Sequence, residues 1–519
     1  MTTQFVYEVN LCFAQSKVPL QRLLSARRIA QPQEFDDPIS IAAMLARDGE
    51  WTVRDAIASQ LGKLARLKLW KEEDNSRMLS LLVTLCHDSQ SVQVRMSAAS
   101  SLAMIHHPHR MLAWLNLARD REAKIRFSGA VCLGKVVLGA SLDQQSMATV
   151  VQELAVMAKL DESFTVRKTA LKSLAAGAKT ASTVAVEALV VASTDFAWPV
   201  RLACCESLPL VVGVAGAGVG DRLANLLLPL IESDSNEYVR QAGRRNLGWF
   251  LAQNPAASPE SLLEAFAKLA TAEVEEQRFL FAFYLPGVLA RTPATSWDRH
   301  LKPAFGLVCN DISGRIRRSL AHSLHLLQVV DPNSLEQDLL PVFYSFLNDM
   351  DDEEEVKLGA VRVAAKFLSI LPSQLRQPAF AKVRECLNEL NSETSVSLAL
   401  SRDARLALAS DLPQIAGLGL ERVEFGAFFL QLAQDQAQLV REKAVESFGL
   451  VCGELDPGVL DHVLDWAGKT HFSWRYLFCR AARSAKQHAP QIFENHFASR
   501  LVGLVQDSVL VVRQEAQVG

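Results

Sequence analysis

The stretch Asp234-Ser-Asn-Glu-Tyr-Val-Arg240 decides the fold of this chain, because variants of it recur along most of the 519-residue sequence. Its form is an acid, four residues, an aliphatic residue and an arginine. Further copies run from Asp48 to Arg54, Asp120 to Arg126, Asp161 to Arg167, Asp195 to Arg201, Asp311 to Arg317, Asp435 to Arg441 and Asp507 to Arg513; looser ones end at Arg95, Arg278, Lys357, Arg405 and Arg475. The basic residues from Arg54 to Arg513 are about 38 residues apart on average. A fixed period in this range predicts a solenoid rather than one globular core.

The residues after each aliphatic-Arg pair predict an α-helix. After Val166, for example, Ala170 and Leu174 follow at spacings of four and eight, which place them on one helical face. Small residues at these positions allow a neighbouring helix to approach closely, and the acid at the head of the helix is a good N-cap. A first, apolar helix precedes each acidic turn, within 39–46, 78–86, 111–118, 150–159, 184–192, 223–231, 262–269, 301–308 and 339–347. Loops between repeats are expected at 255–259, 293, 332, 372–378 and 457–458.

The fold class expected is therefore all-α, a solenoid of about 13 helix pairs in an elongated superhelical arc. Residues 1–38 do not fit the repeat and are interpreted as an irregular N-terminal cap or a decayed repeat. Residues 39–519 form the solenoid, which we interpret as truncated within its last repeat, because no polar capping repeat follows Arg513.

The composition points away from several classes of function. A formal net charge of −3 does not suggest a nucleic-acid-binding surface. The nine cysteines form no CxxC pair and are expected to be buried, reduced thiols. The sequence has no secretory signal and no apolar run long enough to span a membrane. These features favour a cytoplasmic protein, with the nucleus as a second compartment.

The copies resemble HEAT repeats, and most closely those of two phosphatase proteins: the scaffold subunit of protein phosphatase 2A and the regulatory subunit 1 of protein phosphatase 4. Three stretches between residues 311 and 371 are in family order, and two more lie between 472 and 513. The motifs that carry the resemblance are Arg315-Ile-Arg-Arg-Ser-Leu, Asp338-Leu-Leu-Pro-Val-Phe, Glu354-Glu-Val-Lys, Ser473-Trp-Arg-Tyr and Phe493-Glu-Asn-His-Phe. Val239-Arg-Gln-Ala and Leu247-Gly-Trp-Phe resemble the phosphatase 4 subunit in particular.

The resemblance implies a rod or hook whose intra-repeat turns hold a serine/threonine phosphatase catalytic subunit of the 2A/4/6 type, together with a further regulatory subunit. It also implies a ladder of Asp and Arg along successive turns. We expect this ladder to be interrupted at Gln277, Ala404 and Trp474, where the aliphatic residue before the arginine is replaced.

Three tryptophans on the turns are candidate partner contacts, because Trp and Arg are typical of interface hot spots. Trp51 lies near Arg54, Trp198 near Arg201, and Trp474 stands in the run Trp474-Arg475-Tyr476, the first choice for a phosphatase contact by resemblance. For the tryptophans, packing against the adjacent turn is the alternative. For the arginines, ion pairing with acids one repeat away is the preferred interpretation.

No catalytic residue, cofactor or metal ligand is expected. None of the 11 histidines is followed by Glu, as the iron-binding HEAT-like hydroxylases require, and no GxSxG, HExxH or Walker sequence occurs. The function predicted is therefore a non-catalytic phosphatase scaffold or regulatory subunit. The alternative is an importin-like or other HEAT adaptor for transport or complex assembly, which an acidic inner surface around residues 349–355 would favour.

Overall fold

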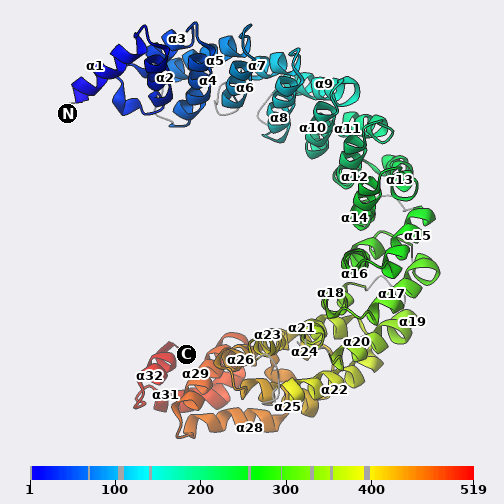
Figure 1. Cartoon of the computed structure of the whole chain (residues 1–519). Coiled ribbons are helices and arrows are strands. Elements are labelled where there is room, and N and C mark those ends of the chain that lie inside the picture. The colour runs from blue at the N-terminus through cyan, green and yellow to red at the C-terminus, as the bar shows by residue number, and fades with distance from the viewer. Residues whose placement is uncertain are drawn as a thin grey trace. The chain divides into compact units, whose positions relative to one another are not determined.

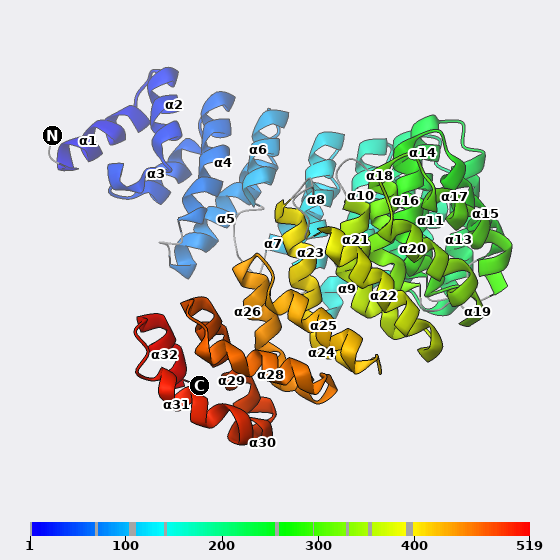
Figure 2. The ribbon, with the colours of Figure 1, turned by 90° about the horizontal axis from the view of Figure 1, so that it is seen from below.

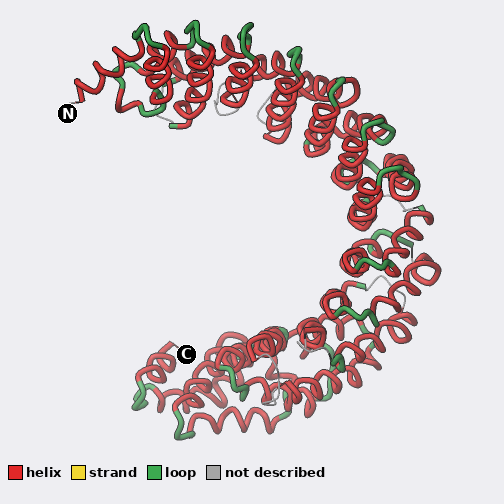
Figure 3. Tube along the Cα trace, viewed as in Figure 1, coloured by secondary structure: helices red, strands yellow, loops and turns green. Residues whose placement is uncertain are grey.

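The computed structural model describes residues 3–67, 71–102, 110–139, 143–254, 259–293, 295–327, 332–350, 355–390 and 398–518 (Figure 1). In these ranges every regular element is helical and no strand occurs (Figure 3). The prediction of an all-α solenoid is confirmed. The chain divides into two compact units, Met1–Pro259 (unit 1) and Glu260–Gly519 (unit 2).

Unit 1 is a series of helix pairs, each followed by the next along the chain. The pairs are α1 (Thr3–Ala14) with α2 (Pro19–Arg28), α3 (Pro38–Leu45) with α4 (Trp51–Arg66), α5 (Glu72–Cys86) with α6 (Val92–Leu102), α7 (Arg110–Ala118) with α8 (Ala123–Gly139), α9 (Gln144–Leu160) with α10 (Phe164–Ala176), α11 (Ala178–Ala192) with α12 (Trp198–Val212), and α13 (Ala217–Glu232) with α14 (Glu237–Gln253).

Unit 2 continues the pattern with more broken helices. The first helices are α15 (Glu260–Lys268), α17 (Lys302–Cys309), α19 (Pro332–Ser334) with α20 (Leu340–Leu347), α22 (Ser373–Leu390), α25 (Arg422–Ala433), α28 (Pro457–Asp465), and α30 (Pro490–Ile492) with α31 (Ala498–Leu504). The second helices are α16 (Glu275–Leu289), α18 (Gly314–Ser323), α21 (Glu355–Ile370), α23 (Leu398–Ser410) with α24 (Leu412–Ala416), α26 (Gln438–Glu446) with α27 (Phe448–Val451), α29 (Phe472–His488) and α32 (Leu510–Val518).

The helices of each unit form two layers. In unit 1 the second helices, from α2 to α14, pack against one another in chain order, while the first helices line the other side (Figure 1). In unit 2 the row of second helices runs α16, α18, α21, α23, α26, α29 and α32, and its first members can also be followed in Figure 2. Each pair therefore buries its apolar faces against its own partner and the next pair, as a solenoid requires.

The core between the layers uses the residues that the repeat pattern predicted. Val166, Ala170 and Leu174 of α10 are fully buried, as are their counterparts in most pairs. Gly129 of α8 shows why small residues recur there: a Cβ added to it would lie 2.6 Å from the backbone nitrogen of Ala118. That distance is too short for any side chain, so this helix pair depends on glycine to pack closely.

Several predicted helix boundaries are wrong in the same way, because prolines expected in loops lie within helices. Pro332 and Pro457 are the first residues of α19 and α28, and Pro378 lies inside α22, which begins one residue after Pro372. A proline in the first helical turn loses no intrahelical hydrogen bond, since that turn has no acceptor for its N–H. The predicted helices at 301–308 and 339–347 also begin earlier, in the π-helical turns Trp297–Leu301 and Leu335–Leu339.

The N-terminal segment forms a helix pair of its own. α1 packs against α2, and α2 packs against α4 of the following pair. Arg22 of α2 pairs with Asp48 at 2.5 Å, in the manner of the repeat arginines described below. Of the two interpretations of residues 1–38, this helix pair agrees with the decayed repeat.

The nine cysteines form no disulfide, and most are buried. Burial raises the pKa of Cys132 to about 11 and that of Cys205 to about 12, so both are unreactive thiols at neutral pH. Within the described ranges no helix is both long enough and apolar enough to cross a membrane.

Candidate partner-binding surface

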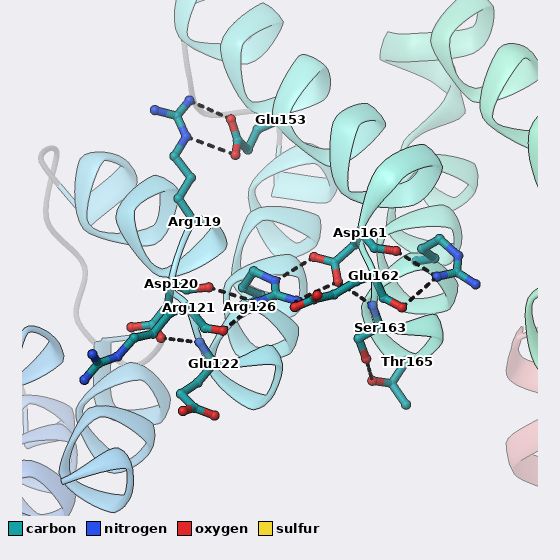
Figure 4. A network of polar contacts seen from close by, with 11 residues as sticks. Arg119, Asp120, Arg121, Glu122, Arg126, Glu153, Asp161, Glu162, Ser163 and Thr165 are labelled. Atoms are coloured by element: carbon teal, nitrogen blue, oxygen red, sulfur yellow. Dashed lines mark hydrogen bonds and ion pairs between the residues drawn. The ribbon is translucent and has the colours of Figure 1, made fainter.

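The turn inside each helix pair is built around one aspartate. In the α9–α10 turn, Oδ1 of Asp161 accepts a hydrogen bond from the Ser163 amide at 2.9 Å, and its main-chain carbonyl accepts one from Nη1 of Arg167 at 2.7 Å. Both carboxylate oxygens also accept hydrogen bonds from Arg126 of the preceding pair, at 2.7 and 2.9 Å (Figure 4). The aspartate thus shapes its own turn and ties it to the neighbouring one.

The same bidentate geometry recurs and forms the ladder that the resemblance implied. Most of these arginines hold the main chain of their own turn with Nη1 and the aspartate of the next pair with Nε and Nη2. Nη1 of Arg405 instead donates to the Ser401 hydroxyl, and Arg95 contacts Asp120 through Nε. The Nε–Oδ2 distances are 2.6 Å for Arg54–Asp88, 2.7 Å for Arg126–Asp161 and Arg167–Asp195, 2.6 Å for Arg201–Asp234 and Arg278–Asp311, 2.7 Å for Arg317–Asp349, and 2.6 Å for Arg405–Asp435 and Arg475–Asp507; Arg95–Asp120 is longer at 3.2 Å.

The interruptions predicted at Gln277, Ala404 and Trp474 are wrong. Arg278, Arg405 and Arg475, which follow these residues, all make the ladder ion pair. The aliphatic residue before the arginine packs in the core. Its replacement by Gln277, Ala404 or Trp474 therefore does not displace the guanidinium group of the arginine that follows.

The ladder changes instead where the acid is absent. The aspartate position, six residues before the arginine, is Ala272 in the α15–α16 turn and Lys469 in the α28–α29 turn. Arg240 of α14 pairs with Glu237 of its own helix, and Arg441 donates only to the carbonyls of its own turn in the described part of the chain. In α21 a lysine replaces the arginine, and Lys357 reaches Glu389 at 3.1 Å.

The ladder favours the charged form of several of its aspartates, among them Asp234 and Asp507. Burial opposes the charge of the Asp234 carboxylate, but hydrogen bonds from Arg201 and the Asn236 amide outweigh it, so the pKa of Asp234 lies below its ordinary value. The hydrogen bond from Arg475 is the largest influence on Asp507 and likewise lowers its pKa. Both groups are therefore charged at any physiological pH.

The predicted contact arginines Arg54, Arg201 and Arg475 are all ladder members with mostly buried side chains. Their hydrogen-bonding groups are directed to Asp88, Asp234 and Asp507 and to carbonyls of their own turns. A partner that approached these turns would meet the residues around the ladder before the guanidinium groups themselves.

Two of the three tryptophans are open to solvent. Trp51 begins α4 and Trp198 begins α12, and nearly half of each side chain is exposed. Trp474 is more covered, because its ring lies 5.5 Å from that of the buried Trp466. The Tyr476 hydroxyl has a partner within the protein, because its oxygen accepts a hydrogen bond from Nη1 of Arg480 at 2.9 Å.

Four exposed aromatic residues lie on three consecutive turns of unit 1. Trp198 stacks on Tyr238 of the next pair with ring centroids 5.7 Å apart, and the Arg167 guanidinium lies 4.8 Å from the centre of the Phe196 ring. Phe196 is 85% exposed and Tyr238 is 65% exposed, and Phe164 of the preceding turn is also exposed. We call Phe164, Phe196, Trp198 and Tyr238 the aromatic turn patch.

Sequence reasoning found only Trp198 in this patch, although a signal for Phe196 was present. Phe196 directly follows the ladder aspartate Asp195, and that position lies at the tip of the turn. Ile312 and Met350 occupy the same position in unit 2 and are about nine-tenths exposed. A large apolar residue directly after a ladder aspartate is therefore presented to solvent, not to the core.

Nothing in the described ranges suggests a reaction centre of the metal type. No group of three or more His, Cys, Asp or Glu side chains there could hold a metal ion. Five of the groups whose pKa is lowered are ladder aspartates, in which the effect of burial is outweighed by hydrogen bonding, chiefly to an arginine of the preceding pair.

Paired helices, stacked in two layers and linked by an Asp–Arg ladder along the turns, define the class: this chain is an α-solenoid of the HEAT type. Solved structures agree on the fold. Importin beta matches with a TM-score of 0.59 and 12% identity over 99% of this chain and 78% of that one. Kap121p bound to Pho4p matches with a TM-score of 0.51 and 13% identity over 98% of this chain and 57% of that one. At such low identity these matches concern the fold alone.

Among characterised proteins, the chain is similar to serine/threonine-protein phosphatase 4 regulatory subunit 1. A segment of 112 residues, 21% of this chain, is 32% identical to the subunit of Homo sapiens, and those of Mus musculus and Rattus norvegicus match equally. The match spans 11% of the length of these relatives. No family model matches the chain. The similarity confirms the resemblance to the phosphatase 4 subunit that the repeat motifs indicated.

Proposed function

We propose that this chain is a non-catalytic scaffold or regulatory subunit that binds a serine/threonine phosphatase catalytic subunit of the 2A/4/6 type. The observation that carries the proposal is the 32% identity with phosphatase 4 regulatory subunit 1 over 112 residues. The solenoid is suited to this role, because it offers a long row of similar turns to a partner. The compartment that we propose is the cytoplasm, where such an enzyme would meet it, with the nucleus as a second site.

The aromatic turn patch supports this proposal as a contact surface in unit 1. Exposed Trp and Tyr side chains lose little conformational entropy on binding and bury a large area, so they dominate many interfaces. The stacking of Trp198 on Tyr238 holds both rings in place before a partner arrives. In unit 2 the turn of Trp474, Arg475 and Tyr476, which are all partly buried, remains a proposed second contact.

The proposal is tested by affinity capture of the tagged chain from cell extract, followed by mass spectrometry. We expect a phosphatase catalytic subunit in stoichiometric amount. Recovery of a small GTPase or nuclear cargo without any phosphatase would contradict the proposal and favour the importin-type adaptor, which shares the fold.

Variants locate the contact. Arg201 is left intact because it forms the ladder ion pair with Asp234. The test variant combines Trp198→Ala with Tyr238→Ala. Phosphatase recovery should fall at least about tenfold, which is the effect expected from the loss of one or two hot-spot residues. Leu450→Ala, an exposed apolar residue away from the turns, is the matched control and should recover the wild-type amount. Equal recovery by both variants would remove the patch from the proposed contact.

A further inference from the structure

A groove separate from the turns lies between two second helices of unit 2. It runs between α16 and α18 and has a volume of about 640 Å³. Its apolar side is formed by Phe279 and Phe283 of α16, with Leu326 at the end of α18. Phe283 is 56% exposed and Leu326 is about half exposed, so water covers apolar surface that a partner could bury.

The rings of the groove are held in a fixed arrangement. Phe279 and Phe283 stack with centroids 5.9 Å apart, and Phe283 meets the edge of the Tyr284 ring at 5.0 Å. The Arg315 guanidinium lies 4.0 Å from the centre of the Phe279 ring. The apolar floor is therefore organised before any ligand binds, which reduces the entropy lost on binding.

The other side of the groove is basic. Arg315, Arg318 and His322 of α18 line it, and the first two have half-exposed side chains in ion pairs with Glu276 and Glu355. The Arg315–Glu276 pair is open to solvent, so it contributes little and can be exchanged for a pair with a ligand carboxylate. In the second pair the Glu355 side chain is mostly covered, while the Arg318 side chain stays accessible from the groove.

Two further cations extend the basic side along α21. Arg362 faces His322, whose pKa is lowered by burial and by the guanidinium groups of Arg362 and Arg318. Lys366, one turn further, is exposed and close to His325. Among the described residues neither cation forms an ion pair within 4 Å, although Lys366 is near Asp411, whose pKa burial raises and the Lys366 ammonium lowers. Gly359 lets the His322 ring lie flat against α21, since an added Cβ would be 3.2 Å from Cδ2 of that ring.

We infer that this groove is a docking site for an acidic peptide segment of a partner protein. The segment places a Leu- or Phe-like side chain between Phe283 and Leu326. Its Asp or Glu side chains point toward Arg318, Arg362 and Lys366. Charge complementarity selects the acidic segment, because the unpaired groups on this face are cations. The site lies on the second helices and not on the turns, so it is independent of the proposed phosphatase contact.

The test is selection of random dodecapeptides displayed on phage against the purified wild-type chain, with counter-selection against a Phe283→Ser, Arg362→Glu variant. We expect the recovered peptides to combine Asp or Glu with Leu, Ile or Phe. Recovery of basic or uncharged peptides, or of no peptide that distinguishes the two proteins, would overturn the inference.

A labelled peptide from the selection then measures affinity by fluorescence anisotropy. Arg362→Glu with Lys366→Glu should weaken binding at least about tenfold, as should Phe283→Ser alone, and raised salt should weaken the wild-type complex. Arg500→Glu and Leu450→Ser, exposed residues elsewhere in unit 2, are the matched controls and should bind as the wild type does. Equal losses in the controls would contradict the location. Phosphatase capture by the Phe283→Ser variant is expected to be unchanged.

Discussion

The pair Arg405–Asp435 shows what a single ladder residue contributes. Arg405 is 1% exposed, its Nε lies 2.6 Å from Oδ2 of Asp435, and its Nη1 donates to Oγ of Ser401. Asp435 also accepts the Ala437 amide at 2.8 Å. The Arg405 guanidinium and the Asp435 carboxylate neutralise each other in the interior. Removal of either side chain therefore leaves the other as an uncompensated buried charge.

Arg405→Met is therefore expected to lower the free energy of unfolding by about 3–5 kcal/mol, because the Asp435 carboxylate stays buried without its counter-ion. The matched control is Arg402→Met in the same helix, whose exposed ion pair with Asp403 is worth about 0–1 kcal/mol. Urea unfolding followed by far-UV circular dichroism measures both. Equal urea midpoints for the two variants would contradict this prediction. The double variant Arg405→Met, Asp435→Leu should regain much of the lost unfolding free energy, because it removes both charges.

At the residue scale, the sequence predicts most of the ladder residues but not where the ladder changes: Arg240 and Arg441 follow the motif and yet, among the residues described, do not reach an acid of the next pair. The expected interruption at Ala404 was wrong because the link depends on Arg405 and on the next acid, Asp435, and not on the residue before the arginine. The informative signal was the missing acid, at Ala272 and Lys469. Exposure of Phe196 follows from its place beside a ladder aspartate. The Arg167 guanidinium against its ring comes from the preceding repeat, and that contact cannot be read from the sequence.

The contact between α27 and α29 depends on a glycine. The backbone amide of Gly449, in α27, donates to Oγ of Ser484 in α29 at 2.9 Å. A Cβ added to Gly449 would lie 2.1 Å from the carbonyl oxygen of Ser484, which is backbone and cannot rotate away. The packing of α27 on α29 therefore requires a residue without a side chain.

Gly449→Ala is expected to cost about 1–3 kcal/mol or more, because α27 must move away from α29 to make room. Gly453, four residues on, has no atom within 4 Å of an added Cβ, so Gly453→Ala should leave stability unchanged or raise it by up to about 1 kcal/mol. Thermal unfolding of the two variants measures the difference. A Gly449→Ala protein as stable as Gly453→Ala would show that this contact does not constrain the helices.

At the element scale, periodicity predicts the second helices well, because Val, Ala and Leu at spacings of four define their buried face. Prediction failed where proline was read as a loop signal, since Pro332 and Pro457 lie in first turns and lose no hydrogen bond. The π-helical turns before Lys302 and Leu340 depend on local hydrogen bonding, which hydrophobic spacing does not encode.

For the whole molecule, the sequence predicts one solenoid of similar pairs, and the structure shows two compact units that meet in sequence at Pro259 and Glu260. The first turn of unit 2 is one of those that lack the ladder acid. Unit 1 carries the aromatic turn patch and unit 2 the acidic-peptide groove. These two proposed surfaces share no residue, so each can be changed without altering the other.

The most direct measurement for the central claim mixes the purified chain with the purified catalytic subunit of protein phosphatase 4. Size-exclusion chromatography with light scattering, at about micromolar concentration where a specific complex of this kind is stable, reports the mass of what elutes. The account predicts a one-to-one complex that the variant with Trp198→Ala and Tyr238→Ala fails to form. Separate elution of the two wild-type proteins, repeated with the 2A and 6 catalytic subunits, would contradict it.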